Sequence, residues 1–339
     1  MPDLPPPVVH AAAPLRVDLA GSGGLPTLAL GQPASALTVT LALAAHVEIR
    51  LGGRTIQLRA ADGEHVTLDS PAGLVYDGHL DEHKAALNML PVTGGVEMLT
   101  GSDAPRAPGL GSRTATCVAM LAALARCRRE AYDGPELAGL AVSLEEAELG
   151  RHVSRLDAWC VALGGVGLLS TDGDQVTAHP GAPDGAAQEL AARAALVALD
   201  RSRAGGVRRS AVVQALAAGD PATTHAVRVL EEMVQPAADA LRSGAWERLA
   251  EVFDASWAAQ QQLDAVLSAA PARTLLDRLR AAGARAWKVT SGQRGGALLV
   301  LCEPECRNDV GAAARECGCT ELAAAPGAGV RIWEEEASA

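Results

Sequence analysis

Hydrophobic and polar positions alternate along the first third of the chain, as they do in half-buried β-strands. The pattern predicts a strand over 14–24 that ends in a glycine turn, and a further strand over 95–100. Between these, residues 36–69 alternate in three runs that are joined by glycine-containing turns. We therefore expect an antiparallel meander over 36–69, because short turns between alternating runs favour antiparallel pairing.

A period of three to four residues replaces this alternation in several later stretches and predicts helices. The predicted helices cover 79–90, a segment after residue 112, 135–149, most of 210–269 with a kink or end at Pro236, and 272–282. A hairpin over 165–176 and a strand over 196–199 separate the earlier helices from the later ones. The end of the chain reads as strand, helix (303–317) and strand (329–333), which we expect to complete a C-terminal α+β domain.

Length and composition favour two domains of mixed α+β structure. The 339 residues are 49% hydrophobic but only 2% aromatic, which is typical of an alanine-rich globular protein. We expect a disordered lead-in over 1–10, an N-terminal domain over 11–170 and a C-terminal domain over 171–339.

The net charge limits the classes of molecule that the protein is expected to bind. A net charge of −11 argues against a nucleic-acid partner, but it leaves room for a phosphorylated substrate in a local basic pocket. The sequence contains no run of 18 apolar residues, so no membrane span is expected. The acidic, proline-rich start does not resemble a signal peptide. The seven cysteines include no C-x-x-C pair and are expected to pack as small apolar residues in a reducing compartment. We therefore expect a cytoplasmic protein.

A glycine-rich turn leads into an apolar helix between 102 and 124. Glycines let backbone N–H groups close around a phosphate, and the helix N-terminus adds partial positive charge. This stretch resembles the phosphate loop of the GHMP kinases, P-x-G-x-G-L-G-S-S-x-A. The matching residues are Gly109, Leu110, Gly111, Ser112 and Ala115, with Pro105 at the proline before the loop. The alternative is an ordinary glycine-rich turn that caps a core helix.

The segment 14–26 resembles the first GHMP motif as it occurs in the heptose-phosphate and fucose kinase branch, P-x-R-I-x-x-x-G-G-G-T-D-x-P. The matching residues are Pro14, Arg16, Val17, Gly21, Gly23 and Pro26. The Thr-Asp pair is missing, because the turn before Pro26 is one residue shorter. The resemblance implies that Gly21, Ser22 and Gly23 contact the substrate, without the aspartate that binds sugar hydroxyls in that branch.

The segment 145–165 resembles the family stretch that carries a catalytic aspartate seven residues before a Gly-Gly pair. Asp157 has this spacing from Gly164, and Glu145 falls where the family places its magnesium-binding acid. The alternative for Asp157 is a helix N-cap, and the alternative for Glu145 is a solvated helix acid, with Glu146 beside it.

The segment 283–301 resembles the third GHMP motif, K-x-x-G-A-G-G-G-G. The residues that fit are Lys288, Gly292, Gly295 and Gly296, and those that depart are Ser291, Gln293 and Arg294. Four arginines, at 201, 203, 208 and 209, lie in the loop that corresponds to a sugar-contacting stretch of the heptose-kinase branch. They are equally consistent with a phosphate clamp and with a solvated helix start.

Taken together, the resemblance implies a two-domain GHMP kinase fold. Its N-terminal domain is of the ribosomal-protein-S5-like type, and its C-terminal domain is a ferredoxin-like α/β sandwich with a helical insertion. It implies a sugar or sugar-phosphate kinase that uses ATP and Mg²⁺, with a homodimer as one option. The nucleotide would contact Pro108, Gly109, Leu110, Gly111, Ser112, Arg113 and Thr114. The substrate would contact Gly21, Ser22, Gly23, Arg201, Arg203, Gly292 and Arg294.

In the chemistry that the resemblance implies, Asp157 orients the acceptor hydroxyl and takes its proton. Glu145 holds the metal, and Arg16 or Lys288 balances charge nearby. Arg113 stands where the family has the second loop serine, a magnesium ligand, and a guanidinium cannot coordinate a metal. The alternative is a GHMP-fold protein that binds a nucleotide or sugar phosphate without kinase activity, or that serves other chemistry.

Overall fold

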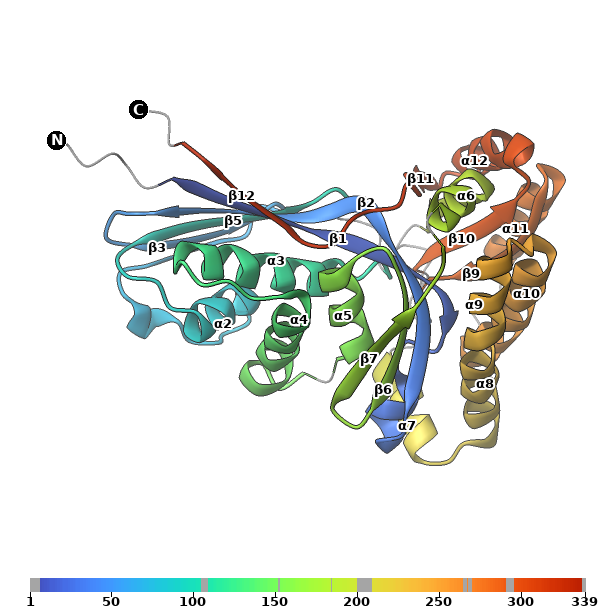
Figure 1. Cartoon of the computed structure of the whole chain (residues 1–339), viewed down its shortest axis with the longest axis horizontal. Coiled ribbons are helices and arrows are strands. Elements are labelled where there is room, and N and C mark those ends of the chain that lie inside the picture. Colours follow the sequence, from blue (N-terminus) through green and yellow to red (C-terminus); the bar gives the residue numbers. More distant parts are fainter. Residues whose placement is uncertain are drawn as a thin grey trace.

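The computed structural model describes residues 7–104, 109–151, 153–183, 185–199, 209–264, 267, 270–290 and 296–336. These residues form a long sheet and a shorter one, each covered by helices, and the first and last described strands lie side by side in the long sheet (Figure 1). The predicted α+β class is confirmed.

The long sheet contains eight strands within the described ranges, in the order β12-β1-β2-β5-β3-β4, with β6 on β2 and β7 on β6. The strands are β1 (Val8–Gly21), β2 (Ala34–Leu51), β3 (Ile56–Ala60), β4 (His65–Leu68), β5 (Val96–Ser102), β6 (Val166–Asp172), β7 (Gln175–Pro180) and β12 (Arg331–Glu335). β1 is buried along its whole length except at His10. β2 pairs with most of it, β12 pairs with Val8–Ala12, and helices including α3 and α5 pack on it. The expectation of disorder up to residue 10 is therefore wrong for residues 8–10.

The predicted meander over 36–69 is wrong in its pairing. β5 lies between β2 and β3, and it runs parallel to β3. Val96 and Met98 of β5 are fully buried, so β5 suits the position beside β2. β4 alternates between exposed and half-buried residues, which suits an edge, and only the β3–β4 hairpin has the expected antiparallel form.

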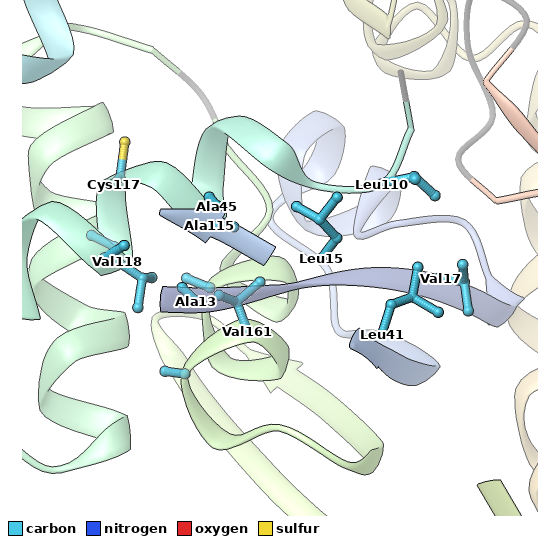
Figure 2. Close-up of a cluster of buried hydrophobic side chains, with 14 of the residues drawn as sticks. Ala13, Leu15, Val17, Leu41, Ala45, Leu110, Ala115, Cys117, Val118 and Val161 are labelled. Atoms are coloured by element: carbon cyan, nitrogen blue, oxygen red, sulfur yellow. The ribbon is translucent and has the colours of Figure 1, made fainter. Parts of the chain in front are cut away.

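The helices of this part are α2 (Asp81–Met89), α3 (Ser112–Cys127), α4 (Gly134–Ser143) and α5 (Arg155–Leu163), with a π-helical turn over Leu144–Glu148. α3 packs on β1 and β2, and its Val118, Leu121 and Leu124 are fully buried. Figure 2 shows this core, in which side chains from β1, α3 and α5 meet those of β2 and Leu110. Short helices α1 (Leu25–Leu30) and Pro71–Gly73 complete this part.

The second sheet has four strands in the described part, in the order β11-β8-β10-β9. They are β8 (Ala194–Ala198), β9 (Ala284–Val289), β10 (Ala297–Cys302) and β11 (Thr320–Leu322). The helices here are α6 (Ala186–Arg193), α7 (Arg209–Ala217), α8 (Pro221–Glu232), α9 (Val234–Ser243), α10 (Trp246–Leu263), α11 (Ala270–Ala281), a short turn (Pro304–Cys306) and α12 (Arg307–Glu316). The β-α-β-β-α-β order with extra helices is the predicted ferredoxin-like unit with a helical insertion.

The last strand does not close the second sheet as expected. β12 instead pairs antiparallel with β1 in the long sheet. The preceding segment crosses β2, where the Gly327 N–H donates to the Thr40 carbonyl at 2.9 Å. The expected boundary at residue 170 also falls inside the β6–β7 hairpin, which belongs to the long sheet.

Two negative findings hold for the described residues. No helix among them has both the length and the apolar character that crossing a membrane requires. Cys117, Cys127, Cys160, Cys302 and Cys306 form no disulfide, and Cys117, Cys160, Cys302 and Cys319 are buried.

Gly164 tests the docking of the C-terminal segment. A Cβ at Gly164 would lie 2.1 Å from the Gly329 backbone nitrogen, whereas a Cβ at Gly165 would meet nothing within 4 Å. Both residues have positive φ. We expect Gly164→Ala to lower the free energy of unfolding by about 3 kcal/mol and Gly165→Ala by about 1 kcal/mol, measured by urea denaturation. Equal losses would contradict the close packing.

His83 on α2 predicts a pH dependence of stability. It is 5% exposed, and its Nε2 lies 2.9 Å from Thr100 Oγ1. Burial lowers its pKa from 6.5 to about 4. Below pH 6.5 the unfolded chain therefore binds a proton that the folded chain excludes, so stability present above pH 6.5 is lost as the pH falls toward about 4.

When the pH is lowered from about 7.5 to about 5, we expect this histidine to lower the free energy of unfolding by about 2 kcal/mol. Urea denaturation at the two pH values measures the loss. His83→Gln should remove most of it, while the exposed control His65→Gln should not. An unchanged pH dependence in His83→Gln would contradict the assignment.

Candidate active site

A buried arginine joins the middle of β1 to α5. Arg16 and Asp18 are two residues apart on β1, and Arg16 Nη1 lies 2.8 Å from Asp18 Oδ2. Arg16 Nη2 lies 2.6 Å from Asp157 Oδ1 on α5, and the Arg16 side chain is 3% exposed. Burial alone would lower the pKa of Arg16, but attraction to Asp157 and Asp18 raises it above its ordinary value. One permanent cation therefore serves two carboxylates.

Asp157 lies in the first turn of α5, three residues after Ser154. Ser154 occupies the N-cap position, and the Asp157 carboxylate points to Arg16. The alternative interpretation of Asp157 as an N-cap is therefore wrong. Its side chain is 12% exposed, so the carboxylate keeps a limited opening to the surface beside a fixed positive charge.

The glycine-rich loop contacts this pair directly. The Arg16 N–H donates to the Leu110 carbonyl at 2.9 Å, and Leu110 is fully buried. Gly111 caps α3 in the left-handed conformation with φ 71°, and a Cβ there would lie 3.1 Å from Arg16 Cγ. Gly111 thus meets two requirements at once, namely the cap conformation and the close approach of Arg16.

The first turn of α3 contains the predicted nucleotide contacts Ser112, Arg113 and Thr114. It contains no acidic residue, and no side chain in the described part of the chain caps it, so its N–H groups are available there to an anion. Gly109, with φ 87°, begins the described part of the loop. Pro108, the remaining predicted contact, lies outside the described residues.

Glu145 belongs to the π-helical turn after α4 and is 2% exposed. Its Oε1 accepts a hydrogen bond from Arg113 Nε at 3.1 Å, and its Oε2 lies 3.7 Å from Arg151 Nη1. Burial raises the pKa of Glu145, against the opposing effect of the two arginines. The interpretation as a solvated helix acid is wrong.

The residues around Glu145 do not fit the magnesium ion that the motif implies. Oε1 is taken by Arg113, and Oε2 is closed to solvent and accepts no hydrogen bond among the described residues. Magnesium keeps several of its waters and needs an open approach. Within the same residues there is also no group of three or more His, Cys, Asp or Glu side chains that could hold a metal ion.

Lys288 on β9 lies between the two sheets and is 1% exposed. Its Nζ donates to the carbonyls of Asp18 at 2.7 Å and Val289 at 3.0 Å, and burial lowers its pKa to about 8. These backbone contacts tie β9 to β1, so the structure places Lys288 as a support for β1. Thr290 adds a second tie, since its hydroxyl donates to the Gly109 carbonyl at 3.0 Å.

The turn over Gly21, Ser22 and Gly23 follows β1, as the first motif predicts. A Cβ at Gly21 would lie 2.5 Å from the Ser35 carbonyl oxygen, so only glycine fits there. Glu231 on α8 accepts hydrogen bonds from the Ser22 N–H at 3.1 Å, from the Ser22 hydroxyl, and from the Ser35 N–H at 2.8 Å. A carboxylate from the second part of the chain thus holds this turn.

Sequence reasoning missed four residues of the site: Asp18, Glu82, Arg151 and Glu231. Two of them left a signal. Asp18 is two residues from Arg16 and so shares its side of the strand, and Glu231 lies one helical turn after Val227, next to the buried Leu230 of α8. Arg201, Arg203, Gly292 and Arg294, predicted to contact the substrate, lie outside the described residues.

Residues 79–165 match the family model of the GHMP kinases N terminal domain. This segment runs from the start of α2 to Gly165 and contains the glycine-rich loop, Glu145 and Asp157. The match confirms the resemblance that the motifs indicated. No curated protein matches the sequence.

Solved structures of similar fold cover almost the whole chain. A D-glycero-D-manno-heptose 1-phosphate kinase from Bacteriodes thetaiotaomicron has a TM-score of 0.77 and 21% identity, over 96% of this chain and 98% of its own. The galactokinase of Lactococcus lactis has a TM-score of 0.72 and 18% identity, over 96% and 95%. The mevalonate kinase of Methanococcus jannaschii has a TM-score of 0.69 and 17% identity, over 96% of each chain. At such identities the likeness concerns the fold.

Glu231 and its neighbour Glu232 form a matched pair for a stability test. Glu231 accepts three hydrogen bonds in a half-buried position, whereas Glu232 is exposed and pairs with Arg228. Glu231→Gln places a donor against a backbone N–H and should lower the unfolding free energy by about 1–3 kcal/mol. Glu232→Gln should change it by less than about 0.5 kcal/mol. Thermal and urea unfolding measure both, and similar values would argue against the clamp.

Proposed function

We propose, because the chain has the GHMP kinase fold, that it catalyses ATP-dependent phosphorylation of a sugar or sugar phosphate. The observation that carries the proposal is the buried pair of Arg16 and Asp157 beside the glycine-rich loop. Phosphoryl transfer needs positioning and charge neutralisation more than covalent chemistry, and these residues supply both.

In the proposed reaction, the uncapped first turn of α3 holds the nucleotide phosphates. The acceptor hydroxyl lies against Asp157, and its oxygen attacks the terminal phosphorus in line with the leaving oxygen. A bond forms between the acceptor oxygen and phosphorus, and the bond to the bridging oxygen of ADP breaks. The hydroxyl proton passes to the Asp157 carboxylate, which Arg16 orients.

Two further features support a sugar or sugar phosphate as acceptor. A Cβ on Gly24, directly after the turn over Gly21, Ser22 and Gly23, would lie 2.9 Å from Ser154 Oγ at the start of α5. A ligand at this turn would therefore lie near the helix that carries Asp157. A heptose 1-phosphate kinase and a galactokinase, whose structure was determined with galactose, share the fold. Hexoses, heptoses and their phosphates are therefore the first acceptors to test.

Binding without catalysis is the second candidate, and the arginine at Glu145 favours it. In that case the protein would bind a nucleotide or sugar phosphate without transferring a phosphoryl group. Nucleotide binding with no turnover over the whole acceptor panel would support this candidate. A lack of ATP binding would argue against the kinase and would leave only binding of a sugar phosphate or of another nucleotide.

Asp157→Asn tests the catalytic assignment. The substitution keeps the shape of the side chain and leaves Arg16 paired with Asp18, so the fold should persist. We expect kcat to fall at least about 100-fold, with ATP affinity within about threefold of the wild type. Coupled ADP release measures turnover, and calorimetry measures affinity. The exposed control Asp69→Asn should behave as wild type, and retained turnover in Asp157→Asn would contradict the assignment.

A further inference from the structure

Four charged side chains form a chain of ion pairs beside the start of α3. Arg113 contacts Glu145 at 3.1 Å, Arg151 lies 3.7 Å from Glu145, and Arg151 also pairs with Glu82. The Glu145 side chain is 2% exposed, while that of Arg113 is 56% exposed. The set therefore reaches from the interior to the surface at the glycine-rich loop.

The charges of this set already balance. Two guanidinium groups face two carboxylates, so no negative charge remains for a divalent cation to neutralise. A magnesium ion at Glu145 would have to displace Arg113 from Oε1, because Oε2 is closed to solvent. It would also meet the positive charge of Arg151. Arg113, a cation of the protein itself, thus stands at a motif position where the family has a metal ligand.

Glu145 holds Arg113 in a way that leaves the two terminal amino groups of its guanidinium available to a ligand. Glu145 engages Nε, and among the described residues neither terminal amino group of Arg113 has a hydrogen-bond or ion-pair partner. Arg113 is the second residue of α3, directly after Ser112 and the Gly111 cap. The two amino groups of a guanidinium match the spacing of two phosphate oxygens, so this side chain suits a nucleotide phosphate.

We propose that Arg113 takes the place of the divalent cation in this protein. The nucleotide phosphates bind the terminal amino groups of Arg113 and the N–H groups of the first turn of α3. Glu145 acts as a positioning residue, because it holds Arg113 through Nε instead of binding a metal. This inference rests on the proposed function, which places the nucleotide at this loop.

The test is calorimetric titration of ATP into the full-length protein, once with EDTA and once with magnesium chloride. The wild type should bind with affinities within about threefold of each other, because its cation is built in. Arg113→Ser should bind about 10- to 100-fold more weakly in EDTA, since it loses charge-assisted hydrogen bonds to phosphate. Arg126→Ser, at the far end of the same helix, is the control and should match the wild type.

Arg113→Ser should also gain a magnesium dependence. The substitution frees Oε1 of Glu145 and adds a hydroxyl that can bind a metal, so magnesium should restore much of the lost affinity. Adding Glu145→Gln to Arg113→Ser should abolish this rescue. Thermal unfolding of each variant confirms that the fold is retained.

The outcomes separate the inference from the function on which it rests. Wild-type binding that requires magnesium, with no loss in Arg113→Ser, would overturn the inference and leave the kinase proposal standing. No ATP binding by the wild type in either buffer would overturn both. Metal-independent binding that is lost in Arg113→Ser is the expected result.

Discussion

The ion pairs of Arg16 with Asp18 and Asp157 are the interaction on which the rest of the site depends. A buried guanidinium is stable only when carboxylates compensate it, so β1 and α5 must keep their relative positions. The same strand residue donates its N–H to Leu110, which fixes the glycine-rich loop against the pair. The candidate base and the phosphate-binding turn are thereby held on one rigid support.

The second part of the molecule supports this site through backbone contacts. Lys288 holds the carbonyl of Asp18, Thr290 holds that of Gly109, and Glu231 holds the turn at Ser22. None of these side chains needs to touch a substrate to matter, because each determines where a segment of the site lies. The return of β12 to β1 joins the end of the chain to the same strand.

The replacement of a metal ion by an arginine makes the positive charge of the nucleotide site permanent. A guanidinium anchored through Nε by a buried carboxylate keeps its charge at all physiological pH values and cannot dissociate. A bound ion is exchangeable and depends on its concentration. An internal cation of this kind would make nucleotide binding independent of magnesium, whether or not a phosphoryl group is then transferred.

The sequence by itself determined local features: the alternating strands in the first third of the chain, the apolar helix after residue 112 and the loop whose glycines match the phosphate-loop motif. These follow from side-chain period and backbone freedom, which neighbouring residues control. Only the tertiary structure decided that β5 lies between β2 and β3 and that β12 pairs with β1. The same is true of the hydrogen bonds between Glu231 and Ser22 and between Arg113 and Glu145. Each of these contacts joins segments far apart in the chain. Such contacts depend on which distant segment best pairs the backbone groups of a strand edge or compensates a buried charge. The sequence pattern within one segment does not contain that information.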